Sequence, residues 1–156
     1  MTTVGASTPR ARRLTSRGRL PLAIVIVTVL GLLDASYLTY IHYHGFGSLL
    51  CLGAHHGHSS CETVQSSSYS KLDGVPVALI GLVGYVAILG SLLVPGDLGR
   101  ATTFLIALIG FGFSAYLTYR EIATIHAICE WCVGSAVCLT ALTLLCAVRF
   151  VRAGSP

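Results

Sequence analysis

The sequence predicts an all-α integral membrane protein, a bundle of four transmembrane helices with an extracytoplasmic loop between the first and second helices. Composition is the first reason: 54% of the 156 residues are apolar, only 10% are charged, and the mean hydropathy is +0.78, whereas soluble domains carry about 25% charged residues. The second reason is that apolar segments of about 20 residues, the length that crosses a bilayer, recur four times. These features exclude a disordered chain, a nucleic-acid-binding module and a small secreted disulfide scaffold.

The predicted spans have few charged residues, and they are expected at residues 20–43, 75–94, 101–119 and 127–148. The predicted domains are a basic cytoplasmic tail at residues 1–19, a membrane domain at 20–150 and a second cytoplasmic tail at 151–156. The first connection, residues 44–74, is expected to be one long polar loop. The other two connections are expected to be short, a turn around Pro95 and a link at residues 120–126.

The distribution of Lys and Arg predicts the orientation, because cytoplasmic segments are rich in these residues. If the N-terminus is cytoplasmic, the inner side holds eight of them: Arg10, Arg12, Arg13, Arg17, Arg19, Arg100, Arg149 and Arg152. The outer side then holds only Lys71 and Arg120. We therefore expect both termini in the cytoplasm. A cleaved signal peptide over residues 1–35 is the alternative, but no convincing A-x-A cleavage site follows.

A short internal repeat links the first and third spans. Gly31-Leu-Leu-Asp-Ala-Ser-Tyr-Leu-Thr-Tyr40 resembles Gly110-Phe-Gly-Phe-Ser-Ala-Tyr-Leu-Thr-Tyr119, and a cysteine follows each copy after ten or eleven residues. One interpretation is two sets of interfacial aromatic residues. The other, which we favour, is two related hairpins that each bring a cysteine to the outer face.

Four of the six cysteines are expected on the outer side, where disulfides persist. Cys129 and Cys132 form a C-x-x-C motif at the outer start of the fourth span, so both sulfurs should share one helix face. The helix N-terminus should also lower the pKa of the first cysteine. These are the properties of a redox-active pair, and at a membrane surface such a pair can exchange electrons with a lipid-soluble carrier.

Cys51 and Cys61 lie in the outer loop with nine residues between them, a spacing that closes easily into a disulfide. Thiol–disulfide exchange requires an attacking thiolate and an accessible disulfide. A mobile loop pair could meet a soluble protein on one side and the C-x-x-C pair on the other, so we expect a relay of two pairs. Cys138 and Cys146, deeper in the fourth span, are expected to be small apolar residues.

Two polar features allow more than one interpretation. His55, His56 and His58 between the loop cysteines are zinc-ligand types, which suggests a non-enzymatic metal-binding membrane protein as an alternative, although that does not explain the C-x-x-C motif. We expect no functional metal site. Asp34 is ionisable within a span and could relay protons, or it could be hydrogen-bonded inside the bundle.

Taken together, these residues resemble the vitamin K epoxide reductase family over about residues 20–150. The resemblance covers the loop cysteines with Cys61-Glu-Thr-Val-Gln-Ser-Ser-Ser-Tyr-Ser, the entry to the second span at Gly74-Val-Pro-Val-Ala-Leu-Ile-Gly81 with Tyr85, the two Tyr-Leu-Thr-Tyr copies and the late C-x-x-C. DsbB-type quinone reductases have the opposite order, with their C-x-x-C in the first outer loop.

The resemblance implies a four-helix bundle around a membrane quinone (menaquinone or ubiquinone), in a bacterial inner membrane. It also implies a thiol:quinone oxidoreductase that oxidises a thioredoxin-like, DsbA-like partner outside the cytoplasm. It implies that Cys129 and Cys132 are the active-site pair, with Cys132 next to the quinone. Cys51 and Cys61 would be the shuttle pair, and Ser67 would lie near the active site as a quinone-binding residue.

Two departures concern the substrate. Vertebrate family members carry an Asn near the start of the second helix and a Tyr four residues after the C-x-x-C, and these polar groups hydrogen-bond the vitamin K ring. Val77 and Ala136 occupy those positions here. Reduction of vitamin K epoxide is therefore the alternative activity, and simple quinone reduction is favoured.

Overall fold

The computed structural model describes residues 9–45 and 60–154 of the chain. Nearly all of this part is helical. In chain order the elements are α1 (Pro9–His44), α2 (Ser60–Ser66), a 3₁₀ turn (Ser68–Ser70), β1 (Lys71–Leu72), β2 (Val75–Pro76), α3 (Val77–Leu92), α4 (Gly96–Arg120), a π-helical turn (Glu121–Ile125) and α5 (Glu130–Gly154).

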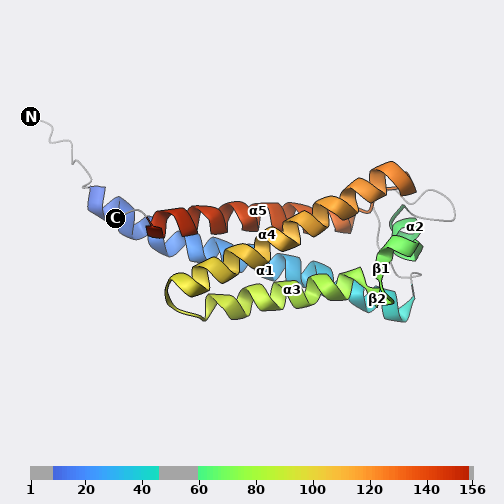
Figure 1. Cartoon of the computed structure of the whole chain (residues 1–156), viewed down its shortest axis with the longest axis horizontal. Coiled ribbons are helices and arrows are strands. Elements are labelled where there is room, and N and C mark those ends of the chain that lie inside the picture. The colour runs from blue at the N-terminus through green and yellow to red at the C-terminus, as the bar shows by residue number, and fades with distance from the viewer. Residues whose placement is uncertain (1–8, 46–59, 155–156) are drawn as a thin grey trace, which may run out of the picture.

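The long helices α1, α3, α4 and α5 run along the long axis of the molecule (Figure 1). α1 packs against α3 and α5, and α4 packs against the same two helices, so each long helix has two long neighbours. The described start of α1 and the end of α5 lie at one end, which we call the tail end (Figure 1). Residues 60–76, which include α2 and the β1–β2 hairpin, lie at the other end, which we call the cap end.

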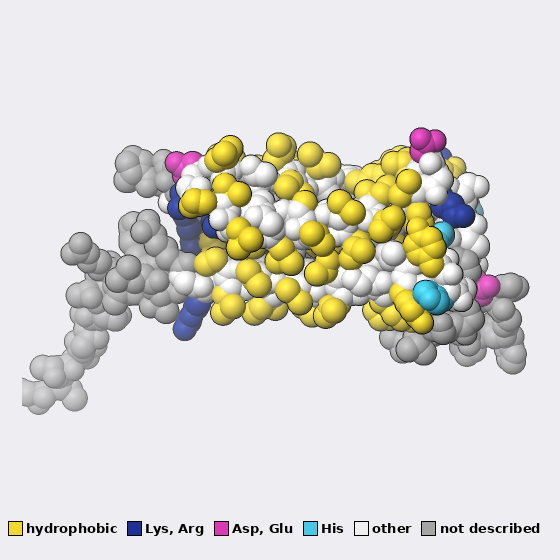
Figure 2. Space-filling model, turned by 90° about the horizontal axis from the view of Figure 1, so that it is seen from below, with side chains coloured by type: hydrophobic (Ala, Val, Ile, Leu, Met, Phe, Trp, Pro, Cys, Tyr) yellow, Lys and Arg dark blue, Asp and Glu magenta, His cyan; other side chains and the backbone are white. Residues whose placement is uncertain are grey.

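The outer surface of the helices is apolar. Leu33 on α1, Val83 on α3, Ile109 on α4 and Leu144 on α5 are each more than half exposed. Figure 2 shows such side chains over the middle of one face, with charged side chains toward the ends. In water a surface of this kind would favour aggregation, whereas in lipid it is well solvated. The protein is therefore an all-α membrane protein.

Three helical segments are long and apolar enough to cross a bilayer, Gly18–His44, Gly96–Ile125 and Glu130–Arg152. α3 is also apolar but has 16 residues, about 24 Å at 1.5 Å per residue. It is shorter than the predicted span 75–94 at both ends. At its start Val75 and Pro76 pair with β1 instead of joining the helix, and at its end the chain turns through Gly96 with a φ of +83°.

The connection between α1 and α3 differs from the polar loop expected for residues 44–74, because its second half is structured. α2 and the 3₁₀ turn lead into the hairpin, where Leu72 pairs with Val75. Asp73 and Gly74 connect the two strands with φ values of +51° and +84°. Two consecutive positive φ angles are typical of a type I′ turn, for which Asp-Gly is well suited. The Asp-Gly turn thus allows residues 60–76 to form a structured cap, which hydropathy alone does not predict.

Two other boundaries differ from the expected ones. α1 begins at Pro9 instead of residue 20, because hydropathy locates the part of a helix that lies in lipid and not the point where the helix itself begins. The expected link at residues 120–126 is largely helical, because α4 continues into the π-helical turn before the chain reverses at His126, which has a φ of +53°.

The interior of the bundle holds apolar side chains and a few hydrogen-bonded polar ones. Tyr85 of α3 is buried against α1 at Gly31, where a Cβ atom would lie 2.3 Å from the tyrosine ring. Between α3 and α4 the hydroxyl oxygens of Ser91 and Thr103 are 2.8 Å apart. Side-chain hydrogen bonds between helices are a common means of association in membranes.

Candidate functional site

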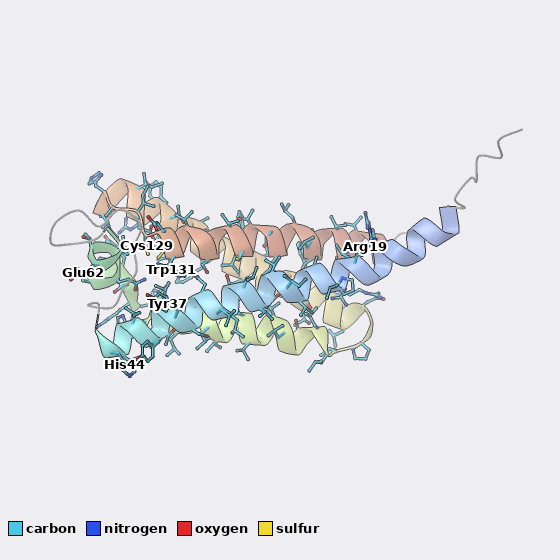
Figure 3. The ribbon with its side chains drawn as sticks, turned by 180° about the vertical axis from the view of Figure 1, so that it is seen from behind. Arg19, Tyr37, His44, Glu62, Cys129 and Trp131 are labelled. Carbon is cyan, nitrogen blue, oxygen red and sulfur yellow. The ribbon has the colours of Figure 1, made fainter. Side chains whose placement is uncertain are left out.

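Cysteines from distant parts of the sequence meet at the cap end. Cys61 of α2 and Cys129 before α5 are buried in one cluster with Val64. Trp131 and Cys132 pack against this cluster. Figure 3 shows Cys129, Trp131, Tyr37 and Glu62 at this end of the molecule, with Arg19 near the opposite end. The fold therefore brings the loop cysteine Cys61 to the C-x-x-C motif.

The oxidation states of the cysteines differ. Cys61 is disulfide-bonded, and its partner lies outside the described residues. Cys129 and Cys132 are free thiols, as are Cys138 and Cys146. Cys51 and the histidines at positions 55, 56 and 58 also lie outside the described residues. Within residues 9–45 and 60–154, no group of three His, Cys, Asp or Glu side chains could hold a metal ion.

Cys129 immediately precedes α5, which begins at Glu130. Its carbonyl oxygen accepts a hydrogen bond from the Val133 N–H at 3.0 Å, so it is the N-cap residue of the helix. The pKa of Cys129 is lowered, mainly because the Cys132 thiol hydrogen-bonds the Cys129 sulfur. Burial opposes this effect, while the backbone N–H groups of Cys132 and Trp131 add to it. Cys129 is thus the sulfur of the pair that more readily becomes a thiolate.

Glu121 is a carboxylate that the sequence did not single out, and it lies next to the cysteine pair. It is only 4% exposed, and its Oε2 accepts a hydrogen bond from the Cys129 backbone N–H at 3.2 Å. Its carboxylate is also an alternative acceptor for the Cys132 S–H, which otherwise points to the Cys129 sulfur. The π-helical turn places Glu121 here, because it extends α4 past Arg120 and over the start of α5. The only hint in the sequence is an acidic residue shortly before the C-x-x-C.

A cavity of about 420 Å³ lies inside the bundle below the cap. Its walls are mainly apolar and come from α1, α3, α4 and α5, while Val64, Gln65 and Ser67 close it from the cap side. Of the described cysteines, only Cys132 lines this cavity. The two cysteines of the motif therefore face different surroundings: Cys129 contacts the cluster with Cys61, and Cys132 contacts the cavity.

Two cap residues approach the cavity with polar groups. Gln65 is buried, and its Nε2 lies 3.9 Å from the Cys132 sulfur. Ser67, the residue that the resemblance assigns to the site, lines the cavity and donates its hydroxyl hydrogen to the Val64 carbonyl oxygen at 2.7 Å. The Ser67 hydroxyl thus stabilises the end of α2. Gln65 was not anticipated, because nothing in the sequence shows that α2 folds back over the C-x-x-C.

Arg120 ties the cap to the helical bundle. Its guanidinium donates a hydrogen bond to the Tyr69 hydroxyl and lies over the Tyr69 ring, 4.3 Å from the centroid. Tyr69 belongs to the 3₁₀ turn and lines the cavity. Arg120 therefore fixes Tyr69, a wall residue of the cavity, to the end of α4. A cation–π contact is worth about 0.5–2 kcal/mol.

The two Tyr-Leu-Thr-Tyr copies lie toward the cap end of α1 and at the end of α4. Tyr37 packs against Trp131 with ring centroids 4.7 Å apart, next to the cysteine pair. Its counterpart in the second copy, Tyr116, is about half exposed. The two copies therefore differ in their surroundings, since only the first contacts the C-x-x-C segment through its leading tyrosine.

The sequence profile of the vitamin K epoxide reductase family matches residues 22–147. The matched region extends from α1 to α5 and includes Cys61, Glu121 and the C-x-x-C motif. It covers most of the chain, including the cap and the walls of the cavity.

Proposed function

Because the chain belongs to the vitamin K epoxide reductase family, whose members are membrane thiol oxidoreductases linked to quinones, we propose that it reoxidises an extracytoplasmic thioredoxin-like protein and passes the electrons to a membrane quinone. The observation that carries this proposal is the division of contacts at the cap end. Cys61 and Cys129 share one buried cluster, and Cys132 alone among the described cysteines lines the cavity. This arrangement suits a relay from Cys51/Cys61 to Cys129/Cys132.

In the first step the reduced partner attacks the disulfide of the loop pair, most readily at Cys51. Cys61 is released as a thiol. The second thiol of the partner then resolves the mixed disulfide at Cys51, so the partner becomes oxidised and Cys51 is also released as a thiol. Cys61 then attacks Cys129 in the oxidised Cys129–Cys132 disulfide, and Cys132 leaves as a thiolate. Cys51 resolves the Cys61–Cys129 bond and restores the loop disulfide, so two electrons have moved to the inner pair. Each exchange passes through a mixed disulfide.

Cys129 and Cys132 then re-form their disulfide as two electrons leave through Cys132, the thiol that lines the cavity. The two protons come from the same pair of thiols. The Glu121 carboxylate is the alternative acceptor for the Cys132 S–H, besides the Cys129 sulfur, and it is well placed to take the Cys132 proton. The carboxylate also holds the Cys129 N–H at 3.2 Å, so it keeps the start of α5 and the two sulfurs in position.

The cavity suits a quinone by its size and its chemistry. A volume of about 420 Å³ lies in the range of small-molecule sites, which are mostly apolar with a few polar groups. Here the walls are apolar, and the Cys132 sulfur is present at one side. A quinone accepts two electrons and two protons, which is the amount that one dithiol releases.

For the membrane arrangement we propose four crossings, with α3 as the fourth span and both termini in the cytoplasm of a bacterial cell. The cap end then faces the oxidising side. Arg19 near the tail end and Cys129 at the cap end (Figure 3) support this orientation, since basic residues favour the cytoplasm. A reporter fused after Pro156 should read as cytoplasmic, and an extracytoplasmic signal would contradict the arrangement.

The test of the proposed function is quinone reduction by the purified protein with a reduced thioredoxin-like protein as the electron donor. Loss of quinone absorbance should match formation of disulfide in the donor, one quinone for each dithiol. Cys51→Ala should block the protein donor but spare some turnover with dithiothreitol, which can reach the inner pair directly. A protein that oxidises dithiols at the same rate without quinone would contradict the proposal.

A further inference from the structure

Asp34 presents an unsatisfied polar atom inside the apolar cavity. It lies on α1 and lines the cavity together with Cys132. Its Oδ2 atom is buried and has no hydrogen-bond partner. A buried polar group without a partner costs free energy, and a carboxyl group within a membrane span marks a functional site by default. This oxygen is therefore free to bind a ligand in the cavity.

Asp34 does not stand alone, because two further polar groups hold it in place. The Ser135 hydroxyl hydrogen-bonds the Asp34 carboxyl. The Tyr85 hydroxyl lies 2.9 Å from the Ser135 hydroxyl oxygen and also donates to the Ser135 carbonyl oxygen at 3.3 Å. α1, α3 and α5 thus each contribute one residue to a connected polar cluster. All three residues line the cavity.

The position of this cluster relates it to the redox pair. Ser135 follows Cys132 by three residues on α5, which is one helical turn or about 4.5 Å deeper along the helix. A ligand group held by Asp34 therefore stays in the part of the cavity that Cys132 reaches. At the two positions where vertebrate family members carry a polar Asn and Tyr, this chain has Val77 and Ala136. Val77 lines the cavity with an apolar side chain, and Ala136 does not line it. Asp34 therefore supplies a polar group that these two positions do not.

We infer that the Asp34–Ser135–Tyr85 cluster is the polar subsite that binds a ring oxygen of the quinone, with the Asp34 carboxyl as the hydrogen-bond donor. A quinone oxygen can only accept hydrogen bonds, so a donor among the mainly apolar walls of the cavity is needed to hold it. A protonated carboxyl has one donor and can accept at its other oxygen, and here that other oxygen is met by Ser135. This inference rests on the proposed function and specifies how the acceptor is recognised.

The test measures binding and not turnover. Trp131 is the only tryptophan of the chain and packs against the cluster that holds the cysteine pair, so a quinone in the cavity should quench its fluorescence. Duroquinone is a suitable probe, because all its ring positions are substituted and it does not arylate thiols. The titrations use the full-length protein in detergent micelles, with helix content checked by circular dichroism.

Asp34→Leu should raise the Kd for duroquinone about tenfold, the loss expected for one hydrogen bond to a polar group. Asp34→Asn retains an N–H donor of the same shape and should stay within about threefold of the unaltered protein. Thr28→Val is the matched control, since Thr28 is a buried polar residue of α1 that bonds only its own helix at Ile24 and does not line the cavity.

Equal affinity of the Asp34→Leu variant and the unaltered protein would overturn the inference while the proposed function stands. Equal loss in Asp34→Asn and Asp34→Leu would also overturn it, because an isosteric donor should substitute for the carboxyl. If the unaltered protein itself shows neither quenching by duroquinone nor its reduction, the proposed function fails and this inference fails with it.

Discussion

Cys129 and Cys146 are both buried cysteines near or on α5, yet the polar groups around their sulfurs differ. Cys146 lies within the helix in the apolar core of the bundle, beside Ile24 and Leu142. Cys129 lies before the first turn, where N–H groups, a second thiol and a carboxylate surround it. Equal burial therefore does not mean equal reactivity, because the neighbouring polar groups decide which thiol can ionise and exchange.

The largest expected effect on activity distinguishes the cysteine in the first turn of α5, Cys132, from Cys146 in the interior of the same helix. Cys132→Ala should reduce quinone reduction to background with any dithiol donor, because a disulfide cannot form with one sulfur. Cys146→Ala should retain activity within about twofold, since it removes only a small apolar contact. Steady-state quinone absorbance assays on both variants measure the difference. Comparable losses in the two variants would show that the core cysteine takes part in electron transfer.

The contact between Cys61 and Cys129 leads to the second prediction. Replacing Cys51 and Cys132 together by Ala should trap a Cys61–Cys129 disulfide, because neither thiol that could resolve it remains. Peptide mapping under non-reducing conditions would detect the bond. The matched control is the Cys51→Ala/Cys146→Ala pair, in which Cys132 can still resolve the bond. Recovery of free thiols only, or of Cys61 joined to Cys138, would refute the order of transfer.

Glu121→Gln should have an intermediate effect: it should slow turnover and at the same time make Cys129 ionise more readily. Turnover should fall about a hundredfold, which is the low end of the effect expected for loss of a proton acceptor. The Glu121 charge raises the pKa of Cys129, so its removal should lower that pKa further and shift half-maximal alkylation of Cys129 to lower pH.

Asp97→Asn is the control for Glu121→Gln, since Asp97 is an exposed carboxylate of α4 paired with Arg100. It should change neither turnover nor alkylation. If alkylation of Cys129 moved to higher pH in Glu121→Gln, the carboxylate would act in some way other than as a nearby negative charge.

The smallest effect on redox chemistry is expected from a change in the α3–α4 turn. At Gly99 a Cβ atom would lie 2.0 Å from the Val94 carbonyl oxygen, so Gly99→Ala should destabilise the protein by about 1–3 kcal/mol through overpacking. Gly90→Ala, where a Cβ meets nothing within 4 Å, should be neutral or slightly stabilising. Thermal unfolding would measure both. Alkylation of Cys129 should be unchanged, and a shift would show that the two regions are coupled.

Much of the fold follows from the sequence alone. Hydropathy and the low content of charged residues identify a helical membrane protein, because each spanning backbone must satisfy its hydrogen bonds internally. The C-x-x-C spacing identifies the redox pair for a similar local reason, since three residues make about one helical turn. The ends of the helices do not follow from hydropathy, which does not reveal that α1 begins at Pro9 or that Val75 and Pro76 form a strand.

Only the tertiary structure shows which distant residues lie next to the C-x-x-C pair. α2 folds over the bundle and brings Cys61 to Cys129, and the π-helical turn brings Glu121 to the same point. Likewise, the cavity joins Asp34, Tyr85 and Ser135 from three helices. Hydropathy and motif spacing describe neighbours along the chain. Contacts between distant segments depend instead on how the helices pack, and that packing decides which thiol meets the loop and which faces the cavity.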